Sequence, residues 1–431
     1  MAITLPRPLD RAESFFWFLD RFSSMNFAVI AECVSRLDAG SLPAALAAVQ
    51  RRHPLLGTAI DVVGGRLHFV PRSAAPVPLE SLASTDWRNA LAERIVRPFA
   101  LGEAPLMRAV LIDAGEGGNI LALVFHHSIG DARSAFPVLE ETLRALAGES
   151  LPGEAANLAP PLTALYPPQL TGEPGQAALA QLKAARKAAA EKIGWPVAQA
   201  GHRLADEQRA RMIGIELSNV EVAGLAARAR AAGATINGAI GAAQLIALHE
   251  RFGDDVERVL GLTCAADLRP YLAATVDAAT PGFYVTLVTS LQRVGGEATL
   301  WPLAVRLSHA IRQQMQNGVG HLFYDLMPPA DRFPVEEGSI AQFNATMARG
   351  VQTSLLSNVG RLPPLAPLSG IAVRARSFAL CPTMTQPVFT AVATHEDGMT
   401  INLNYNAAQF ADTDAAAVAG TLGRLLRGTP A

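Results

Sequence analysis

The stretch Asn119-Ile-Leu-Ala-Leu-Val-Phe125 runs directly into His126-His127-Ser-Ile-Gly-Asp131-Ala-Arg-Ser134, and this junction decides the fold of the first half of the chain. Its first part is an apolar run of strand length. After the junction, apolar residues recur at steps of three and four, as on one face of a helix: Phe136, Leu139, Leu143 and Leu146. Because Pro137 cannot donate a hydrogen bond inside a helix, we expect regular helix to begin close to Ser134. The segment from His126 to Asp131 is therefore predicted to form a strand-to-helix turn.

The residue types in this turn point to proton transfer. A histidine that follows the end of a strand can leave the sheet and reach a cleft, which a histidine inside the strand cannot do. Its ordinary pKa near 6.5 suits the removal of a proton from a hydroxyl or an amine at neutral pH. Asp131 follows His127 by four residues, so it can fix the turn or pair with an arginine that holds the loop in shape.

Two other interpretations of the turn stay open. In the first, the two imidazoles are hydrogen-bonded at a seam between domains and Asp131 only caps the following helix. In the second, His126, His127 and Asp131 bind a metal ion, but adjacent residues rarely converge on one ion and no further ligand stands nearby in the sequence. We therefore expect no metal.

Mixed strand and helix signals continue on both sides of the turn. Before it, residues 27–34 are strand-like, residues 41–49 have helical spacing, and two strand-like runs flank the Gly64-Gly65 turn. Residues 149–175 are rich in proline and glycine and are expected to connect two units. The second half repeats the alternation and contains the capping box Ser218–Glu221. We predict an α/β (α+β) fold with an N-terminal unit at 1–175 and a C-terminal unit at 176–431.

Composition limits the class of protein. The 431 residues are 50% hydrophobic and carry 36 Lys+Arg against 38 Asp+Glu, so the chain can bury a core and gives no chain-wide argument for nucleic acid or an anionic membrane. The cysteines lie far apart, which argues against a disulfide framework or a zinc site: Cys33, Cys264 and Cys381. No signal peptide and no apolar run near 18 residues is found. We expect a soluble cytoplasmic protein, as a monomer.

At these residues the sequence resembles the chloramphenicol-acetyltransferase-like acyltransferases, which include condensation domains and polyketide-associated acyltransferases. Their signature HHxxxDG, with a serine two residues later, stands here as His126 to Ser134, with Ala132 in place of the glycine. Four more blocks follow the family's order: Arg52-His53-Pro54-Leu55-Leu56 for "RHxxLR", with Gly57 in place of the last arginine, Pro105 to Arg108 for the strand entry, Asp267-Leu268-Arg269-Pro270 for "DLRP", and Ser357 to Arg361 for "SNxG".

The resemblance implies a fold and a chemistry. It implies two subdomains, each a mixed sheet flanked by helices, with a tunnel at their interface that donor and acceptor enter from opposite faces. His127 would be the general base on the acceptor, and His126 would support it. Asp131 would point away from the cleft and hold the turn by an ion pair, for which Arg269 is the candidate partner. No serine or cysteine stands in a nucleophile elbow, so no covalent acyl-enzyme is expected.

Further site residues are weaker candidates with an ordinary structural alternative. Backbone N–H groups in the Gly130 turn or the Asn358 side chain are candidates to hold the oxyanion. Arg269 could equally be a surface ion-pair residue, and Asn358 could simply belong to a turn. A basic cluster could meet the phosphates of coenzyme A or of a phosphopantetheine arm, or could be a solvated helix face: Lys183, Arg186, Lys187, Lys192, Arg203, Arg209 and Arg211.

The leading hypothesis is an acyltransferase of natural-product or lipid metabolism. It would move an acyl group from acyl-CoA or an acyl-carrier protein, used as co-substrate with no permanently bound cofactor, to a small-molecule alcohol or amine. A non-catalytic relative that only binds a ligand or partner is the alternative, and a hydrolase is a third possibility. Which of the two donors is used, the acceptor and the choice between O- and N-acylation stay open. The segment Gly282-Phe283-Tyr284 and the region of Met384 are apolar tunnel candidates that suggest a hydrophobic substrate.

Overall fold

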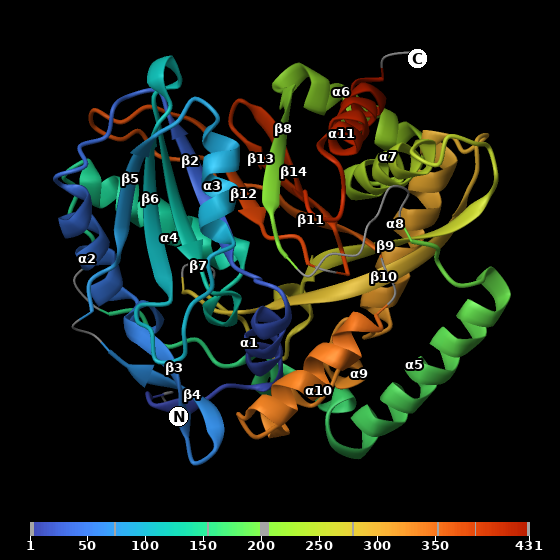
Figure 1. The fold of residues 1–431 in the computed structure, drawn as a ribbon, viewed down its shortest axis with the longest axis horizontal. Coiled ribbons are helices and arrows are strands. Elements are labelled where there is room, and N and C mark those ends of the chain that lie inside the picture. The colour runs from blue at the N-terminus through green and yellow to red at the C-terminus, as the bar shows by residue number, and fades with distance from the viewer. Residues whose placement is uncertain are drawn as a thin grey trace.

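The computed structural model describes residues 4–72, 75–152, 155–198, 207–277, 280–350, 353–383 and 385–428. The described chain builds two mixed β-sheets that lie side by side, each with its own helices (Figure 1). Met384 and Arg203, which the sequence analysis singled out, lie outside the described residues. Among the described residues, no single helix is long and apolar enough to span a bilayer; the consecutive helices at Asn219–Ala231 and Ile236–Glu250 meet that criterion only together and are bent by 94°.

The N-terminal sheet has five strands in the order β12-β2-β7-β6-β5. All neighbours are antiparallel except the parallel pair β5 and β6. Its strands are β2 (Phe27–Cys33), β5 (Leu79–Ala83), β6 (Met107–Asp113), β7 (Asn119–Phe125) and β12 (Val373–Leu380). Helices α2 (Leu42–Arg52) and α4 (Ala132–Leu146) share one core with alternate residues of these strands, and α3 (Trp87–Ile95) shares the other. Successive side chains of a strand point to opposite faces of the sheet, so both faces of this sheet are buried.

The C-terminal sheet has six strands in the order β10-β9-β11-β13-β14-β8. The pairs of β11 with β9 and with β13 are parallel and the others antiparallel. Its strands are β8 (Ala210–Ser218), β9 (Arg258–Asp267), β10 (Val285–Val294), β11 (Ser354–Arg361), β13 (Val388–His395) and β14 (Gly398–Asn406). The helices around it are α6 (Asn219–Ala231), α7 (Ile236–Glu250), α8 (Leu300–Gln316) and α11 (Asp412–Arg427). The predicted capping box is present, since Ser218 Oγ accepts from the Glu221 N–H.

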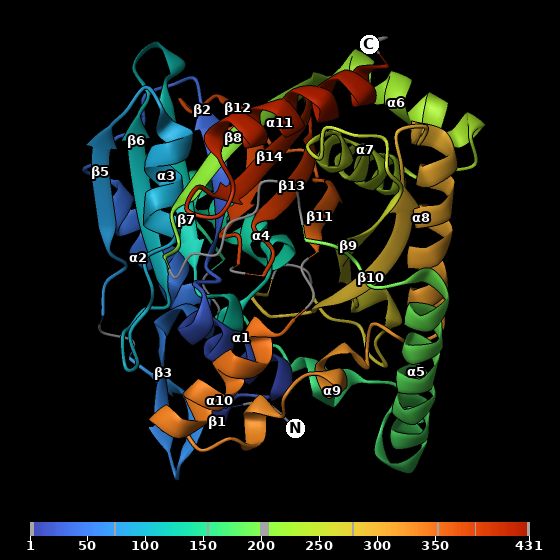
Figure 2. The same cartoon turned by 45° about the vertical axis from the view of Figure 1, so that its right-hand side comes forward.

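The remaining elements lie around the junction of the two sheets. Figure 2 shows α1 and α10 below this junction and α5 at the lower right of the molecule. These elements are α1 (Arg11–Phe22), α5 (Gly172–Ile193), α9 (Phe323–Leu326), α10 (Glu337–Ala348), and a three-stranded sheet of β1 (Arg7–Pro8), β3 (Thr58–Val63) and β4 (Arg66–Pro71). The predicted hairpin around Gly64-Gly65 is confirmed as β3 and β4.

One strand from beyond the predicted boundary at residue 175 belongs to the N-terminal sheet. β12 belongs to the second half of the sequence but pairs antiparallel with β2, from Val373 opposite Cys33 to Leu380 opposite Phe27. The C-terminal half therefore supplies an edge strand to the N-terminal sheet. This exchange locks the two units together by backbone hydrogen bonds, while the predicted limits of the units stay a prediction.

Contacts of Asp131 set the boundaries of two elements, and one of these boundaries differs from the sequence-based expectation. Helix α4 begins at Ala132, two residues before the expected start, because Asp131 and Ser134 cap its first turn. Pro137 lies inside the helix without ending it. β10 begins at Val285, directly after Tyr284, whose N–H donates to the Asp131 carboxylate instead of to a neighbouring strand.

Candidate active site

The turn after β7 is fixed by a reciprocal helix cap. Asp131 Oδ1 accepts from the Ser134 N–H at 3.0 Å, and Ser134 Oγ accepts from the Asp131 N–H at 3.2 Å. Ser134 Oγ also donates to the Gly282 carbonyl oxygen at 2.9 Å. The aspartate therefore does act as a helix cap, which was one of the open alternatives, and the cap is tied to the second half of the chain.

Asp131 also holds the ion pair that the resemblance implied. Arg269 Nη2 lies 3.0 Å from Asp131 Oδ2, and the same oxygen accepts from the Tyr284 N–H at 2.9 Å. Arg269 Nη1 donates to Asp267 Oδ1 at 2.9 Å, so two carboxylates fix the guanidinium. Asp131 is 1% exposed. Capping and ion pairing therefore occur together, and both hold the turn in place.

His127 presents a defined imidazole edge. Its Nδ1 lies 2.9 Å from the carbonyl oxygen of Gly130, which only accepts, so Nδ1 carries the hydrogen and Nε2 keeps its lone pair. The ring packs against Phe16 and Phe27, with centroid distances of 4.4 and 4.9 Å. Burial lowers the pKa of His127 below its usual value near 6.5. The imidazole is therefore neutral, and able to accept a proton, at neutral pH.

His127 lines a cavity of about 340 Å³ between the two sheets. The cavity wall comes from α1, the turn that holds His127 and Asp131, β9, β10, β11 and the residues around α9 and α10. Much of it is apolar, including Phe16, Phe27, Tyr324 and Phe389. A neutral imidazole in a largely apolar cavity is an arrangement that suits general-base chemistry.

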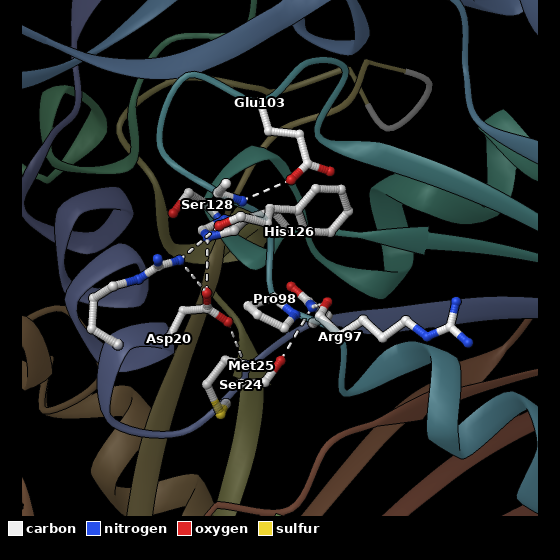
Figure 3. Close-up of polar contacts among 12 residues, drawn as sticks. Asp20, Ser24, Met25, Arg97, Pro98, Glu103, His126 and Ser128 are labelled. Atoms are coloured by element: carbon white, nitrogen blue, oxygen red, sulfur yellow. Dashed lines mark hydrogen bonds and ion pairs between the residues drawn. The ribbon is translucent and has the colours of Figure 1, made fainter.

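His126 turns away from this cavity into a separate buried network (Figure 3). Its Nδ1 accepts from the Ser128 N–H at 3.1 Å, and its Nε2 lies 3.9 Å from Asp20 Oδ2. Figure 3 shows the Asp20 carboxylate between the His126 ring and the backbone of Met25, whose N–H donates to Asp20 Oδ1 at 3.1 Å. Arg21 Nη2 donates to Asp20 Oδ2 at 2.6 Å. His126 thus makes one hydrogen bond within the turn, while its Nε2 faces Asp20 without a hydrogen-bond partner among the described residues; its supporting role stays a prediction.

Acid should destabilise the protein partly through His126. Burial lowers its pKa to about 4, so between about pH 6.5 and pH 4 the unfolded chain binds a proton that the folded chain does not. Stability then falls as the pH falls, by at most about 1.4 kcal/mol per pH unit for this group. We expect His126→Gln to lose less unfolding free energy between pH 7 and pH 4.5, measured by chemical denaturation.

The matched control for this prediction is His68→Gln, which removes a partly exposed imidazole from β4. An equal loss of unfolding free energy in wild type and in His126→Gln over the same pH range contradicts the assignment of this acid sensitivity to His126.

Asn358 lies in the cavity wall on β11, but half of its amide is engaged. Its Oδ1 accepts from the Gly360 N–H at 2.8 Å, where the strand register shifts between Asn358 and Arg361. Gly360 has φ +78°, a value that favours glycine. Asn358 therefore lies in an irregular part of β11 and not in a separate turn, and its Nδ2 group remains a candidate oxyanion donor. The Gly130 carbonyl, by contrast, serves to orient His127.

Several site residues were missed by the sequence analysis. Phe16 of α1 stacks on the imidazole, and Ser128 Oγ donates to the Glu13 carbonyl oxygen at 2.8 Å, which fixes α1 on the turn. Arg133 bridges the two halves: its guanidinium donates to the Val359 carbonyl oxygen at 3.0 Å and pairs with Asp267 at 3.2 Å. Residues 12–20 of α1 are all buried, the charged ones included, so the sequence of this helix does not show which face meets the turn.

The "RHxxLR"-like block acts at a distance from the cavity. Arg52 Nε lies 2.9 Å and His53 Nε2 lies 2.6 Å from the two carboxylate oxygens of Glu141. Glu141 belongs to α4, the helix that follows the turn with His127. This block therefore orients α4 against α2.

The predicted basic cluster is mostly a solvated surface. Arg186 lines the cavity from α5, whereas Lys183, Lys187 and Lys192 are exposed on the same helix. Arg209 and Arg211 pair with Glu207 and Glu93. In the described part of the chain, no group of three or more His, Cys, Asp or Glu side chains is arranged to hold a metal ion.

Two family models match consecutive parts of the chain. Residues 15–160 match "Condensation domain", and residues 206–413 match "Phthiocerol/phthiodiolone dimycocerosyl transferase C-terminus". Among curated proteins, phosphinothricin tripeptide synthetase PhsC of Streptomyces viridochromogenes is 30% identical over 174 residues, which are 37% of this chain and 16% of that protein. The probable synthetase CymA of Salinispora arenicola is 29% identical over 153 residues, 33% of this chain and 2% of that protein. The chain thus spans a small part of these relatives.

Solved structures show the same fold over nearly the whole chain. Polyketide synthase associated protein 5 of Mycobacterium tuberculosis aligns with a TM-score of 0.64 at 15% identity, covering 99% of both chains. Trichothecene 15-O-acetyltransferase of Fusarium sporotrichioides aligns with a TM-score of 0.70 at 13% identity, covering 98% of this chain and 95% of that one. The first condensation domain of the calcium-dependent antibiotic synthetase, in complex with a substrate analogue, aligns with a TM-score of 0.66 at 16% identity, covering 98% and 96%.

Proposed function

Because this chain belongs to the chloramphenicol-acetyltransferase-like superfamily of condensation domains and polyketide-associated acyltransferases, we propose that it transfers an acyl group from a thioester to a hydroxyl or an amine. One observation carries the proposal: His127 lines a cavity that both halves of the chain line, and the Gly130 carbonyl holds its Nδ1, which leaves Nε2 as the basic nitrogen. The names of the curated relatives, which are peptide synthetases, support a place in natural-product synthesis.

The proposed reaction is a direct transfer. His127 Nε2 takes the proton from the acceptor O–H or N–H while the acceptor atom attacks the thioester carbonyl carbon. The resulting tetrahedral oxyanion collapses, the new C–O or C–N bond remains, and the C–S bond breaks. The proton held on Nε2 passes to the departing thiolate, which restores neutral imidazole. The Gly130 carbonyl stabilises the imidazolium that exists between these steps, because it accepts from Nδ1–H.

A covalent route through cysteine is disfavoured by the positions of the three thiols. Cys33, Cys264 and Cys381 are buried and free. Burial raises the pKa of Cys33 and of Cys264 to about 12, and raises the pKa of Cys381 as well. Their reactive thiolate forms are therefore scarce at neutral pH.

A thiol-release assay tests the proposal. Acyl-CoA and acyl-carrier-protein donors are each supplied with and without a panel of small alcohols and amines, and the acylated acceptor is identified by mass spectrometry. We expect thiol release that depends on the acceptor, together with the ester or amide product, for one of the two donor classes. Thiol release without an acceptor would mean a hydrolase, and binding without turnover for every donor would mean a non-catalytic relative.

A further inference from the structure

One part of the cavity wall is polar, in contrast to the apolar wall around His127. Four of its residues are linked by hydrogen bonds, and we call them the hydroxyl cluster: Thr263, Thr289, Thr353 and Gln386. Thr263 Oγ1 lies 3.0 Å from Thr289 Oγ1 and 2.9 Å from Thr353 Oγ1, and Gln386 Nε2 donates to Thr353 Oγ1 at 3.3 Å. Thr263 is 3% exposed and Thr353 is 6% exposed. Polar groups inside an apolar cavity are costly unless they are paired.

The cluster has one more proton than its own contacts use. Each of the three threonine hydroxyls has one proton to donate. The two threonine–threonine hydrogen bonds use two of these protons, and Gln386 supplies its own proton to the third contact. One hydroxyl proton, on Thr289 or on Thr353 at an end of the chain of hydroxyls, is therefore free to be donated. Both residues face the cavity, so its natural partner is a ligand.

The sheet fixes how far this donor lies from the catalytic turn. On β9, Thr263 and Asp267 share one face, and Asp267 binds the Arg269 guanidinium that also holds Asp131. Four residues of strand separate them, which is about 13 Å. Between them Ala265 lies opposite Leu287 of β10, and both line the cavity. The wall is thus polar at the cluster, apolar in the middle and charged beside the turn.

From this pattern we propose that the hydroxyl cluster is a substrate subsite for a hydrogen-bond acceptor, such as an amide carbonyl or a carboxylate, that an apolar spacer separates from the reacting thioester. The proposal rests on the acyltransferase function stated above. The acceptor group can come from the thiol arm of the donor or from the distal end of the acyl chain. Both present an oxygen with lone pairs to a hydroxyl donor.

Direct binding tests the subsite without requiring turnover. Three unreactive thioethers serve as probes in isothermal titration calorimetry: S-hexyl-pantetheine, S-hexyl-N-acetylcysteamine and S-(5-carboxypentyl)-N-acetylcysteamine. The test protein carries Thr289→Val and Thr353→Val together, which remove the hydroxyls at nearly constant volume. The matched protein carries Thr289→Ser and Thr353→Ser, which keep them. Thr390→Val removes a buried hydroxyl from β13, outside the cavity wall, as a control.

We expect the double valine variant to bind a probe with the recognised oxygen about 5- to 10-fold more weakly, as the loss of one hydrogen bond implies, and the double serine variant to bind it like wild type. Weakening confined to the pantetheine probe assigns the subsite to the thiol arm, and weakening confined to the carboxypentyl probe assigns it to the acyl chain. Equal weakening of all three probes in the double valine variant alone assigns the subsite to the amide next to the sulfur, which all three share. Equal weakening in the double valine and double serine variants, or no weakening beyond that of Thr390→Val, overturns the subsite.

The outcome is independent of the assay for the proposed function. If acceptor-dependent thiol release occurs but the probes bind the valine variant as they bind wild type, the transferase function is supported and the subsite is contradicted. If no donor is turned over but the binding pattern is as expected, the subsite stands as a ligand site and the transferase falls. Melting temperatures of all variants show that the comparison is made between folded proteins.

Discussion

Replacing His127 by glutamine should lower kcat about 10²- to 10⁴-fold, which is the contribution expected of a positioned general base. Glutamine approximates the size of the imidazole and keeps an N–H, but it has no basic nitrogen. Since acceptor and donor are bound by the cavity wall rather than by Nε2, the KM values should change much less than kcat. Steady-state kinetics with the donor and acceptor identified in the thiol-release assay measures both parameters.

A matched control separates loss of the base from loss of a buried histidine. His321 is 3% exposed, bonds the Tyr271 carbonyl oxygen at 3.0 Å through Nε2, and is not among the residues of the cavity wall. We expect His321→Gln to keep the wild-type rate. A His127→Gln enzyme with the wild-type kcat and an unchanged melting temperature contradicts the assignment of the base.

The second large effect is expected from replacing Asp131, which should lower both the stability of the fold and the activity. Asp131→Ala removes the acceptor of the Ser134 N–H and of the Tyr284 N–H, and leaves Arg269 with one carboxylate in place of two. Removing one partner of a buried ion pair typically lowers the free energy of unfolding by about 3–5 kcal/mol. We therefore expect a clearly lower melting temperature and a lower activity, since the turn that aims His127 loses its support.

Two companion variants show which contact matters. Asp131→Asn keeps an oxygen for the helix cap but loses the charge, so its stability should lie between those of wild type and Asp131→Ala. Glu140→Ala breaks a more exposed pair with Arg144 on the same helix and should change stability by no more than about 1 kcal/mol. If Asp131→Ala melts at the wild-type temperature, the structural role of Asp131 is wrong.

Local patterns in the sequence were sufficient to predict the strand-to-helix turn and the hairpin around Gly64-Gly65. The run before His126 and the spacing after Ser134 are both periodic over a few residues, so they predict β7 and α4 and place the histidines between them. The ion-pair partner Arg269, 138 residues away, came from the family resemblance and is confirmed by the contact distance. A contact between two residues that far apart in the chain leaves no local pattern in a single sequence.

Other features depend on long-range pairing and could not be predicted. β12 carries Arg374 and Arg376 and was not predicted as a strand; it is placed by its pairing with β2, some 340 residues earlier in the chain. The hydroxyl cluster combines residues of two strands with Thr353 and Gln386, each unremarkable in its own segment. Such sites arise from the register of neighbouring strands, which a sequence pattern restricts but does not fix.

The pH dependence of kcat/KM tests the central claim most directly, because it reports the ionisation of the base in the free enzyme. Burial lowers the pKa of His127, and only the neutral ring can accept a proton. With an alcohol acceptor, or with an amine acceptor counted only as its unprotonated form, the rate should therefore be level across neutral and mildly alkaline pH. It should fall tenfold per pH unit only below a pKa that lies under about 6.5. The residual rate of His127→Gln should lack this step. A wild-type rate that keeps rising above about pH 8, or the same acid step in His127→Gln, contradicts the account.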